Sequence, residues 1–428
     1  MSIDVLFVNP NNRIVSPLAG IEQPLWLGLI AQDMRNNGKS VGVVDAEVED
    51  LTIEETIARI QLAEPRKVIF VVMGNNPSVS STPKMLVTKQ LIDRLIGEIP
   101  LFVTGLHPSA LPQRTKDELG IPVLRGKIFA GTPNMPWDLF PMDKYIAHNW
   151  HCLDGSPRQP YAVVYTSLGC PFSCDFCNVK ALYGWQNKVW FREPTDVLKD
   201  IDILVDKYHV RNIKFWDELF ALNEERVSAI CDGLIERNYD LNIWCYARVD
   251  RVTQPMLDKM RNAGIRWVSF GFESGSDNVL GDIHKRANIA RAYEAVYMAH
   301  SADLYVGGNF IFGLPKDTPA TMLETLEFAK NLNVEWANFY QAKSYPGSKL
   351  FDENGGSEKW QDYGQFLNKS GQSDYDSAMV FRDRAFNEYY TDSQYTDNLR
   401  RKFGEQAVKQ IRDMLALGKP VTRSAELC

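Results

Sequence analysis

Three cysteines lie within eight residues of one another near the middle of the chain, at Cys170, Cys174 and Cys177. Their spacing is C-x3-C-x2-C, inside the segment LGCPFSCDFC. Three thiolates on one loop can ligate three irons of a four-iron cluster, which leaves the fourth iron open to a small molecule. The alternative is a zinc site that takes its fourth ligand from elsewhere. Structural zinc sites usually take their ligands from two separate pairs of closely spaced residues. The other four cysteines of this chain are scattered and form no second pair, so the spacing favours the iron–sulfur cluster.

The cysteines must be positioned by the elements around them, and these alternate between strand and helix. Between the strands, helices are expected at ranges such as 197–208, 224–236 and 321–332. Six strand–helix units predict a partial parallel barrel, because a complete eight-unit barrel needs about 250 residues. The cysteines follow the first strand, at the rim where active sites of parallel barrels lie. The strands are expected at 161–167, 211–216, 241–246, 266–272, 304–311 and 335–341.

The first third of the chain also alternates, in units of about 30 residues. This pattern predicts a doubly wound parallel sheet, whose ligands bind at the carboxyl ends of the strands. We expect that α/β domain at 1–125, a proline-rich linker at 126–160, the partial barrel at 161–344, and a mostly helical cap or substrate-facing region at 345–428. The expected elements are strands at 5–8, 40–44, 68–73 and 100–104 and helices at 25–34, 53–62 and 84–96.

Composition and charge argue against several classes of protein. The 428 residues carry a net charge of −7, which disfavours a broad nucleic-acid surface. Neither a basic, apolar leader nor an apolar run long enough to cross a bilayer is present, so we expect a cytoplasmic protein with no membrane partner. Clustered cysteines in a reducing compartment indicate metal ligation rather than disulfides. With nucleic-acid and membrane partners disfavoured, we expect a small-molecule substrate.

The cysteine motif, with Phe176 before its last cysteine, resembles that of the radical S-adenosylmethionine (SAM) superfamily. The wider chain is similar to the subgroup with an N-terminal cobalamin-binding-like domain. This resemblance implies a 4Fe-4S cluster that cleaves SAM to a 5′-deoxyadenosyl radical, fed by an electron donor such as flavodoxin or ferredoxin. The similar segments are QPLWLGL from Gln23, GLHPSALP from Gly105, WDLFPM from Trp137, FWDELF from Phe215, ARVD from Ala247, GFESGS from Gly271 and FIFGLP from Phe310.

The resemblance also implies a set of SAM contacts at the strand ends. Asp217 and Glu218 would meet the amino group of SAM, and Arg248 its carboxylate. The alternatives are that the two carboxylates cap the next helix and that Arg248 pairs with Asp250 or Glu218. Ribose or methionine would meet Glu273 and Ser274. Adenine would lie along the backbone at Gly313, beside the apolar edge of Phe176. The complete set is Phe176, Asp217, Glu218, Arg248, Glu273, Ser274 and Gly313.

Cobalamin is the second implied cofactor, held at the strand ends of the first domain. The motif Asp-x-His-x-x-Gly is absent from the sequence, so we predict no histidine beneath the cobalt, although His107 is a possible ligand by type. These loops equally suit ordinary turns. The candidate contacts are Asn75, Asn76, Ser78, Ser80, Thr82 and His107.

Three functions remain open from the sequence. The first is hydrogen abstraction from a small-molecule substrate for cobalamin-dependent methyl transfer to an unactivated carbon or phosphorus. The second is a cobalamin-independent radical dehydratase, cyclase or epimerase with a vestigial first domain. The third, from a different class, is a zinc-bound binding module.

Overall fold

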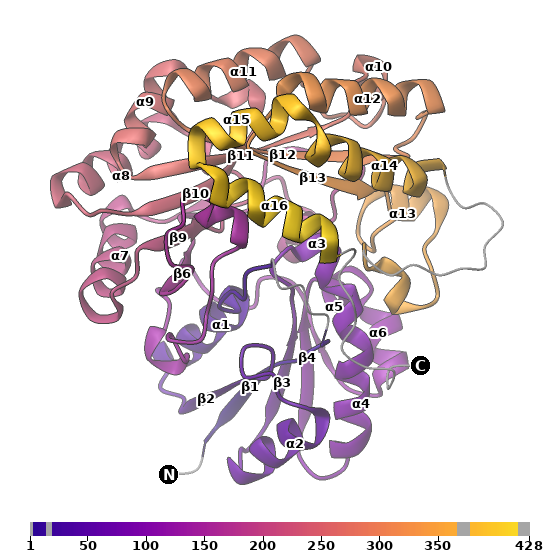
Figure 1. The fold of residues 1–428 in the computed structure, drawn as a ribbon. Helices are drawn as coiled ribbons and strands as arrows, with labels where there is room; N and C mark the ends of the chain where they lie inside the picture. Colours follow the sequence, from indigo (N-terminus) through magenta and orange to yellow (C-terminus); the bar gives the residue numbers. More distant parts are fainter. Residues whose placement is uncertain (1–2, 14–18, 366–376, 418–428) are drawn as a thin grey trace.

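The computed structural model describes residues 3–13, 19–365 and 377–417. It contains two parallel sheets, and Figure 1 shows the first below the second, with the carboxyl ends of the first sheet directed toward the second. The first sheet has the order β2-β1-β3-β4-β5, and every neighbouring pair is parallel. Its strands are β1 (Val5–Asn9), β2 (Val41–Asp45), β3 (Val68–Val72), β4 (Leu101–Gly105) and β5 (Val123–Leu124).

Helices connect these strands in the pattern of a doubly wound sheet, as predicted. A capping box between Thr52 and Glu55 begins α2 and satisfies backbone N–H groups at that end. Two short helices occupy places where only loops were expected, namely α3 (Pro77–Ser80) after β3 and α5 (Leu106–Ala110) after β4. The other helices are α1 (Leu25–Asn36), α2 (Ile53–Leu62), α4 (Met85–Leu95) and α6 (Pro112–Leu119).

The second sheet has the order β13-β12-β11-β10-β9-β6, again with parallel neighbours throughout. In the described chain, β6 and β13 are its two ends and are not paired with each other, so the predicted partial six-strand barrel is confirmed. The strands are β6 (Tyr161–Val164), β9 (Asn212–Phe215), β10 (Asn242–Ala247), β11 (Ile265–Glu273), β12 (Tyr305–Phe312) and β13 (Trp336–Gln341).

The helices between these strands also agree with the predicted alternation. An antiparallel pair of two-residue strands, β7 (Ser167–Leu168) and β8 (Trp190–Phe191), was not anticipated and brackets the cysteine segment. The helices are α7 (Pro194–Tyr208), α8 (Glu224–Arg237), α9 (Gln254–Asn262), α10 (Asp277–Asp282), α11 (Ile289–Ser301) and α12 (Pro319–Leu332).

The segment between the two sheets packs into the second one. Trp150 lies in a 3₁₀ turn, Asn149–Cys152, and its ring centroid is 5.1 Å from those of both Trp244 and Trp267. It also stacks against Trp336 at 6.3 Å. Aromatic pairs at these distances add to the stabilisation from burial. The amino-terminal end of the sheet is therefore filled by tryptophan side chains.

The C-terminal part is mostly helical, as predicted, and covers the edge strand β13. The hydroxyl of Tyr390 donates to the carbonyl of Ala337 at 2.7 Å and accepts from its N–H at 3.0 Å. Gln365 does the same for both backbone groups of Gln341. Edge strands need such cover because unpaired backbone groups invite association. The helices are α13 (Lys349–Asn354), α14 (Ser377–Thr391), α15 (Ser393–Phe403) and α16 (Glu405–Leu417). None of the described helices is long and apolar enough to cross a bilayer.

Candidate active site

The three clustered cysteines lie on one loop, residues 169–178, which we call the cysteine loop. It follows β7 and begins at Gly169, which has a φ of +94°. A β-carbon there would lie 2.2 Å from the carbonyl oxygen of Lys188, so this position requires glycine. All three cysteine residues are partly exposed, and none forms a disulfide. Burial, together with the nearby thiols of Cys174 and Cys170, raises the pKa of Cys177 to about 12.

The donor set fits an iron–sulfur cluster, because three adjacent thiols offer sulfur ligands and metal binding favours their thiolate forms. Within the described residues, no group of three or more His, Cys, Asp or Glu side chains is placed to hold a single metal ion. Cys152, Cys231 and Cys245 are buried and do not belong to the cysteine loop. Cys428 lies outside the described residues.

Asp217 is completely buried at the carboxyl end of β9. Its carboxylate accepts hydrogen bonds from the N–H and hydroxyl of Thr166, at 2.6 and 2.5 Å, and from the hydroxyl of Ser167 at 2.5 Å. The carboxylate thus ties the end of β9 to the segment that leads into the cysteine loop. Its proposed contact with the amino group of SAM stays a prediction.

Glu218 is bound to the cysteine loop itself. It accepts from the N–H of Gly169 at 2.8 Å and from the hydroxyl of Tyr183 at 2.6 Å. Burial raises the pKa of Glu218 to about 7, against the effect of these two hydrogen bonds. The alternative that Asp217 and Glu218 cap the next helix is wrong, because the side chain of Asn223 caps α8.

Arg248 lies against the cysteine loop. Its guanidinium is 3.8 Å from the sulfur of Cys174 and stacks 3.9 Å from the ring centroid of Phe172. It also pairs with Asp250 at 2.9 Å, the structural pairing considered from the sequence, and donates to the carbonyl of Lys285 at 2.5 Å. A positive charge at this place favours thiolates and would suit an anionic ligand beside them.

Glu273 closes β11 with a φ of +67°, after a break in register between Gly271 and Glu273. Its carboxylate pairs with the ammonium of Lys285 at 2.6 Å, and each side chain is only 7% exposed. The same ammonium lies 5.9 Å from the ring centroid of Phe176 on the cysteine loop. Lys285 was missed from the sequence, since it lies in an ordinary polar loop after α10 and no motif marks it.

Ser274 and Gly313 are tied to neighbouring helices. The hydroxyl of Ser274 lies 3.3 Å from that of Thr325 in α12. Gly313 has a φ of +81°, its N–H donates to Asp317 at 2.9 Å, and a β-carbon there would lie 2.6 Å from that of Ala378 in α14. The contacts of both residues with SAM stay predictions.

Residues 74–82, which we call the first-domain loop, meet the cysteine loop directly. The hydroxyl of Ser78 donates to the side-chain oxygen of Asn178 at 2.6 Å. The carbonyl of Asn75 accepts from the buried ammonium of Lys214 on β9, at 3.4 Å. The two loops follow strands of different sheets, and Ser78 and Asn178 are 100 residues apart in sequence. The fold therefore brings the strand ends of the first sheet against the cysteine loop.

Ser80, Thr82 and His107 are bonded within the first domain. The hydroxyl of Ser80 donates to the carbonyl of Asn76 at 2.7 Å, and that of Thr82 lies 3.2 Å from Nδ1 of His107. Burial lowers the pKa of His107 to about 3, so its ring is neutral at physiological pH. Its buried Nε2 has no hydrogen-bond partner in the described part of the chain.

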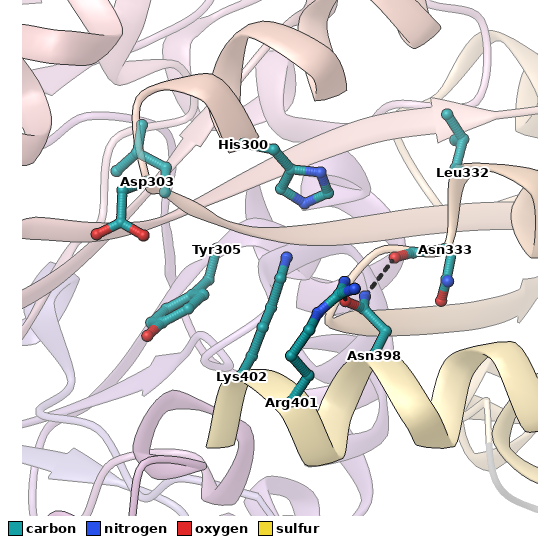
Figure 2. A pocket seen from close by; sticks show the side chains of 9 residues that line it. His300, Asp303, Tyr305, Leu332, Asn333, Asn398, Arg401 and Lys402 are labelled. Carbon is teal, nitrogen blue, oxygen red and sulfur yellow. Dashed lines mark hydrogen bonds between the residues drawn. The ribbon is translucent and has the colours of Figure 1, made fainter. Parts of the chain in front are cut away.

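A separate hollow of about 480 Å³ lies at the opposite end of the second sheet (Figure 2). It is bounded by the ends of α11 and α12, by the start of β12 and by α15, whereas the cysteine loop lies at the carboxyl ends of the strands. His300 and Lys402 both bind the buried carboxylate of Glu335, and Arg401 donates to Asn398 at 2.7 Å. The pair of Lys402 and Glu335 therefore holds α15 against the start of β13, at the end of the sheet opposite the cysteines.

Residues 164–329 match the family model of the Radical SAM superfamily. An uncharacterized methyltransferase of Pyrococcus horikoshii is 28% identical over 390 residues, covering 81% of this chain and 82% of that protein. An anaerobic magnesium-protoporphyrin IX monomethyl ester cyclase of Rubrivivax gelatinosus is 25% identical over 402 residues, covering 82% of this chain and 70% of the cyclase.

Two solved structures share the fold. The radical SAM methyltransferase TsrM of Kitasatospora setae, with cobalamin and a [4Fe-4S] cluster bound, superposes with a TM-score of 0.65 at 16% identity, over 82% of this chain and 78% of that one. The cobalamin-dependent radical SAM enzyme OxsB superposes with a TM-score of 0.57 at 17% identity, over 84% and 56% of the two chains. The cysteine motif and the family match agree that residues 164–329 form a radical SAM domain, and the fold of the chain is similar to those of TsrM and OxsB.

Proposed function

We propose that this chain is a cobalamin-dependent radical SAM methyltransferase that acts on a small-molecule substrate in the cytoplasm. One observation carries the proposal: Ser78 of the first-domain loop contacts Asn178 beside Cys177 at 2.6 Å. A corrin held at the strand ends of the first sheet would therefore lie beside SAM held at the cysteine loop. The name of the Pyrococcus relative and the cofactors of TsrM support the same activity.

The cysteine loop would hold the cluster through Cys170, Cys174 and Cys177. With SAM bound and one electron from a donor such as flavodoxin or ferredoxin, a cluster of this kind supplies a 5′-deoxyadenosyl radical, which abstracts hydrogen from substrate. The chain's own charges then orient SAM. Arg248 is placed beside Cys174 to attract a carboxylate. Glu218 is oriented by its hydrogen bond from Gly169 to accept from an ammonium group.

Cobalamin would supply a methyl carrier at the first-domain loop. The chemistry of that loop fits the group in two respects. Its residues 75–80 are half-buried, and four of the six are polar, which suits hydrogen bonds to corrin amides. The neutral ring of His107 also keeps a nitrogen without a partner among the described residues.

A second candidate function is a cobalamin-independent radical reaction, such as dehydration, cyclisation or epimerisation. The observation that favours it is the internal bonding of Ser78, Ser80 and Thr82, whose hydroxyls already have protein partners. Each such hydroxyl would have to exchange a protein hydrogen bond for one to a corrin. The cyclase among the relatives is in keeping with this alternative.

The test is anaerobic reconstitution of the purified chain with iron and sulfide, followed by reduction with SAM present. We expect about four irons per chain and formation of 5′-deoxyadenosine. Protein incubated with hydroxocobalamin should then retain about one corrin per chain through gel filtration. If the protein binds iron and cleaves SAM but retains no corrin, the cobalamin-independent reaction takes the place of methyl transfer as the proposed function. Bound zinc in place of iron would support the binding module instead.

A further inference from the structure

Asn178 follows the last cysteine directly and is only 1% exposed. Both halves of its amide are used, and each goes to a different part of the chain. Its oxygen accepts from the hydroxyl of Ser78 at 2.6 Å, in the first-domain loop. Its nitrogen donates to the carbonyl of Pro346 at 3.0 Å, in the segment after the last strand. One side chain beside Cys177 thus joins three regions.

The segment after β13 holds the cysteine loop at a second point. Lys349 pairs with the carboxylate of Asp175 at 2.8 Å, and the N–H of Leu350 donates to the carbonyl of Asp175 at 3.1 Å. His284, from the loop after α10, binds the same carboxylate at 3.0 Å. Asp175 lies between Cys174 and Cys177, so this segment fixes the middle of the loop while Asn178 fixes its end.

Close packing around Gly347 also joins the segment after β13 to the two domains. Gly347 has a φ of +87°, and a β-carbon there would lie 2.9 Å from that of Ala181 and 3.0 Å from that of Ala110. Ala181 follows the cysteine loop, and Ala110 ends α5 of the first domain. Packed interiors transmit displacements because they have no free volume to absorb them. A displacement of Ser78 must move Asn178 or break the hydrogen bond between them, and the close packing around Gly347 leaves little room for Asn178 to adjust.

We propose that Asn178 is a positioning residue that makes the geometry of the cysteine loop depend on the first-domain loop. This inference rests on the proposed function in one respect, namely that a second cofactor binds at the first-domain loop. An occupant there that moves Ser78 would change the position of the three thiols. By linkage, binding at either loop then alters affinity at the other by the same factor.

The coupling can be read on the iron-free chain, with no cofactor present. Ser78→Ala removes only the hydroxyl that Asn178 accepts from. Ser80→Ala is the matched control, because that hydroxyl bonds within its own loop. We expect Ser78→Ala to speed maleimide labelling of Cys170 and Cys174 at least threefold, resolved by peptide mass spectrometry. Ser80→Ala should leave these rates within twofold of the wild type. Equal rates in the two variants would overturn the proposal.

A second measurement uses the reconstituted enzyme. Loss of the Ser78 hydrogen bond should weaken SAM binding about fivefold and change the electron paramagnetic resonance spectrum of the SAM-bound cluster. In the wild type, hydroxocobalamin should shift the SAM dissociation constant, and Ser78→Ala should abolish that shift. An unchanged spectrum and unchanged SAM affinity in Ser78→Ala would also contradict the proposal. A wild type that holds no iron would refute the proposed function instead, while the labelling rates still decide the role of Asn178.

Discussion

The buried pair of Glu273 and Lys285 gives the sharpest test of the site. The two charges are 2.6 Å apart, and each side chain is 7% exposed. Lys285→Met keeps the length of the side chain but removes its charge, so the carboxylate of Glu273 stays buried without its partner. Breaking a buried pair in this way costs about 3–5 kcal/mol. We expect a loss of this size in the free energy of unfolding of the iron-free protein, measured by urea denaturation.

The double variant Glu273→Gln, Lys285→Met separates folding from function. Removing both charges is often nearly neutral for stability, so unfolding should return to within about 2 kcal/mol of the wild type. Binding of SAM should not return, because a charge-assisted contact contributes about 1.5–3 kcal/mol, which is a tenfold or greater change in affinity. The reconstituted double variant should therefore keep its iron and bind SAM at least tenfold more weakly in equilibrium dialysis.

Two results would refute this reasoning. A loss below about 1 kcal/mol in Lys285→Met would mean that water or another group compensates Glu273. Wild-type affinity for SAM in the stable double variant would mean that the pair serves folding alone. The matched control is Lys259→Met, because Lys259 pairs with Asp232 on exposed helix surfaces, where ion pairs contribute little.

Three further predictions concern the cluster, the rim and the first domain. Cys170→Ala should lose bound iron and SAM cleavage, whereas Cys231→Ser should keep both, as read by iron analysis and product assay. Gly313→Ala should lose about 1–3 kcal/mol of stability in urea denaturation, because its φ of +81° is strained for alanine and Ala378 obstructs the β-carbon. Burial raises the pKa of Asp45 from 3.8 to about 6, so the stability it contributes is present below pH 4 and lost as pH rises through 6. The stability of wild type relative to Asp45→Asn should then fall by up to about 3 kcal/mol between pH 4 and 7 in urea titrations.

Much of the fold could be predicted because its signals are local. Each strand of the barrel is a short apolar run followed by a turn, and each helix shows the helical period, so the six strand positions agree with the structure within a few residues. The spacing of the cysteines predicts an iron–sulfur cluster over a zinc site, and their role as cluster ligands stays a prediction. In contrast, β5, β7 and β8 have two residues each and carry no periodic signal.

The partners of the site residues could not be predicted in the same way. Lys285 meets Glu273 only because the loop after α10 returns to the strand ends, and no local pattern encodes that return. The contact of Ser78 with Asn178 joins two sheets across 100 residues. Trp150 lies in a stretch that reads as a linker, yet it fills the end of the barrel, because burial of its ring against Trp244 outweighs the lack of local structure.

The way in which the cysteine loop is held bears on how it can take up a cluster. The anchors of the loop contact residues beside the cysteines and not the thiols themselves. Glu218 binds Gly169, Lys349 and His284 bind Asp175, and Asn178 binds Ser78 and Pro346. A loop without these anchors would have to be ordered by the metal, and that ordering would reduce the affinity for it. Here the protein sets the backbone of the loop in advance, as precise sites require. The same anchors come from the barrel, the first domain and the C-terminal segment, so the geometry at the thiols depends on the assembly of all three parts of the chain.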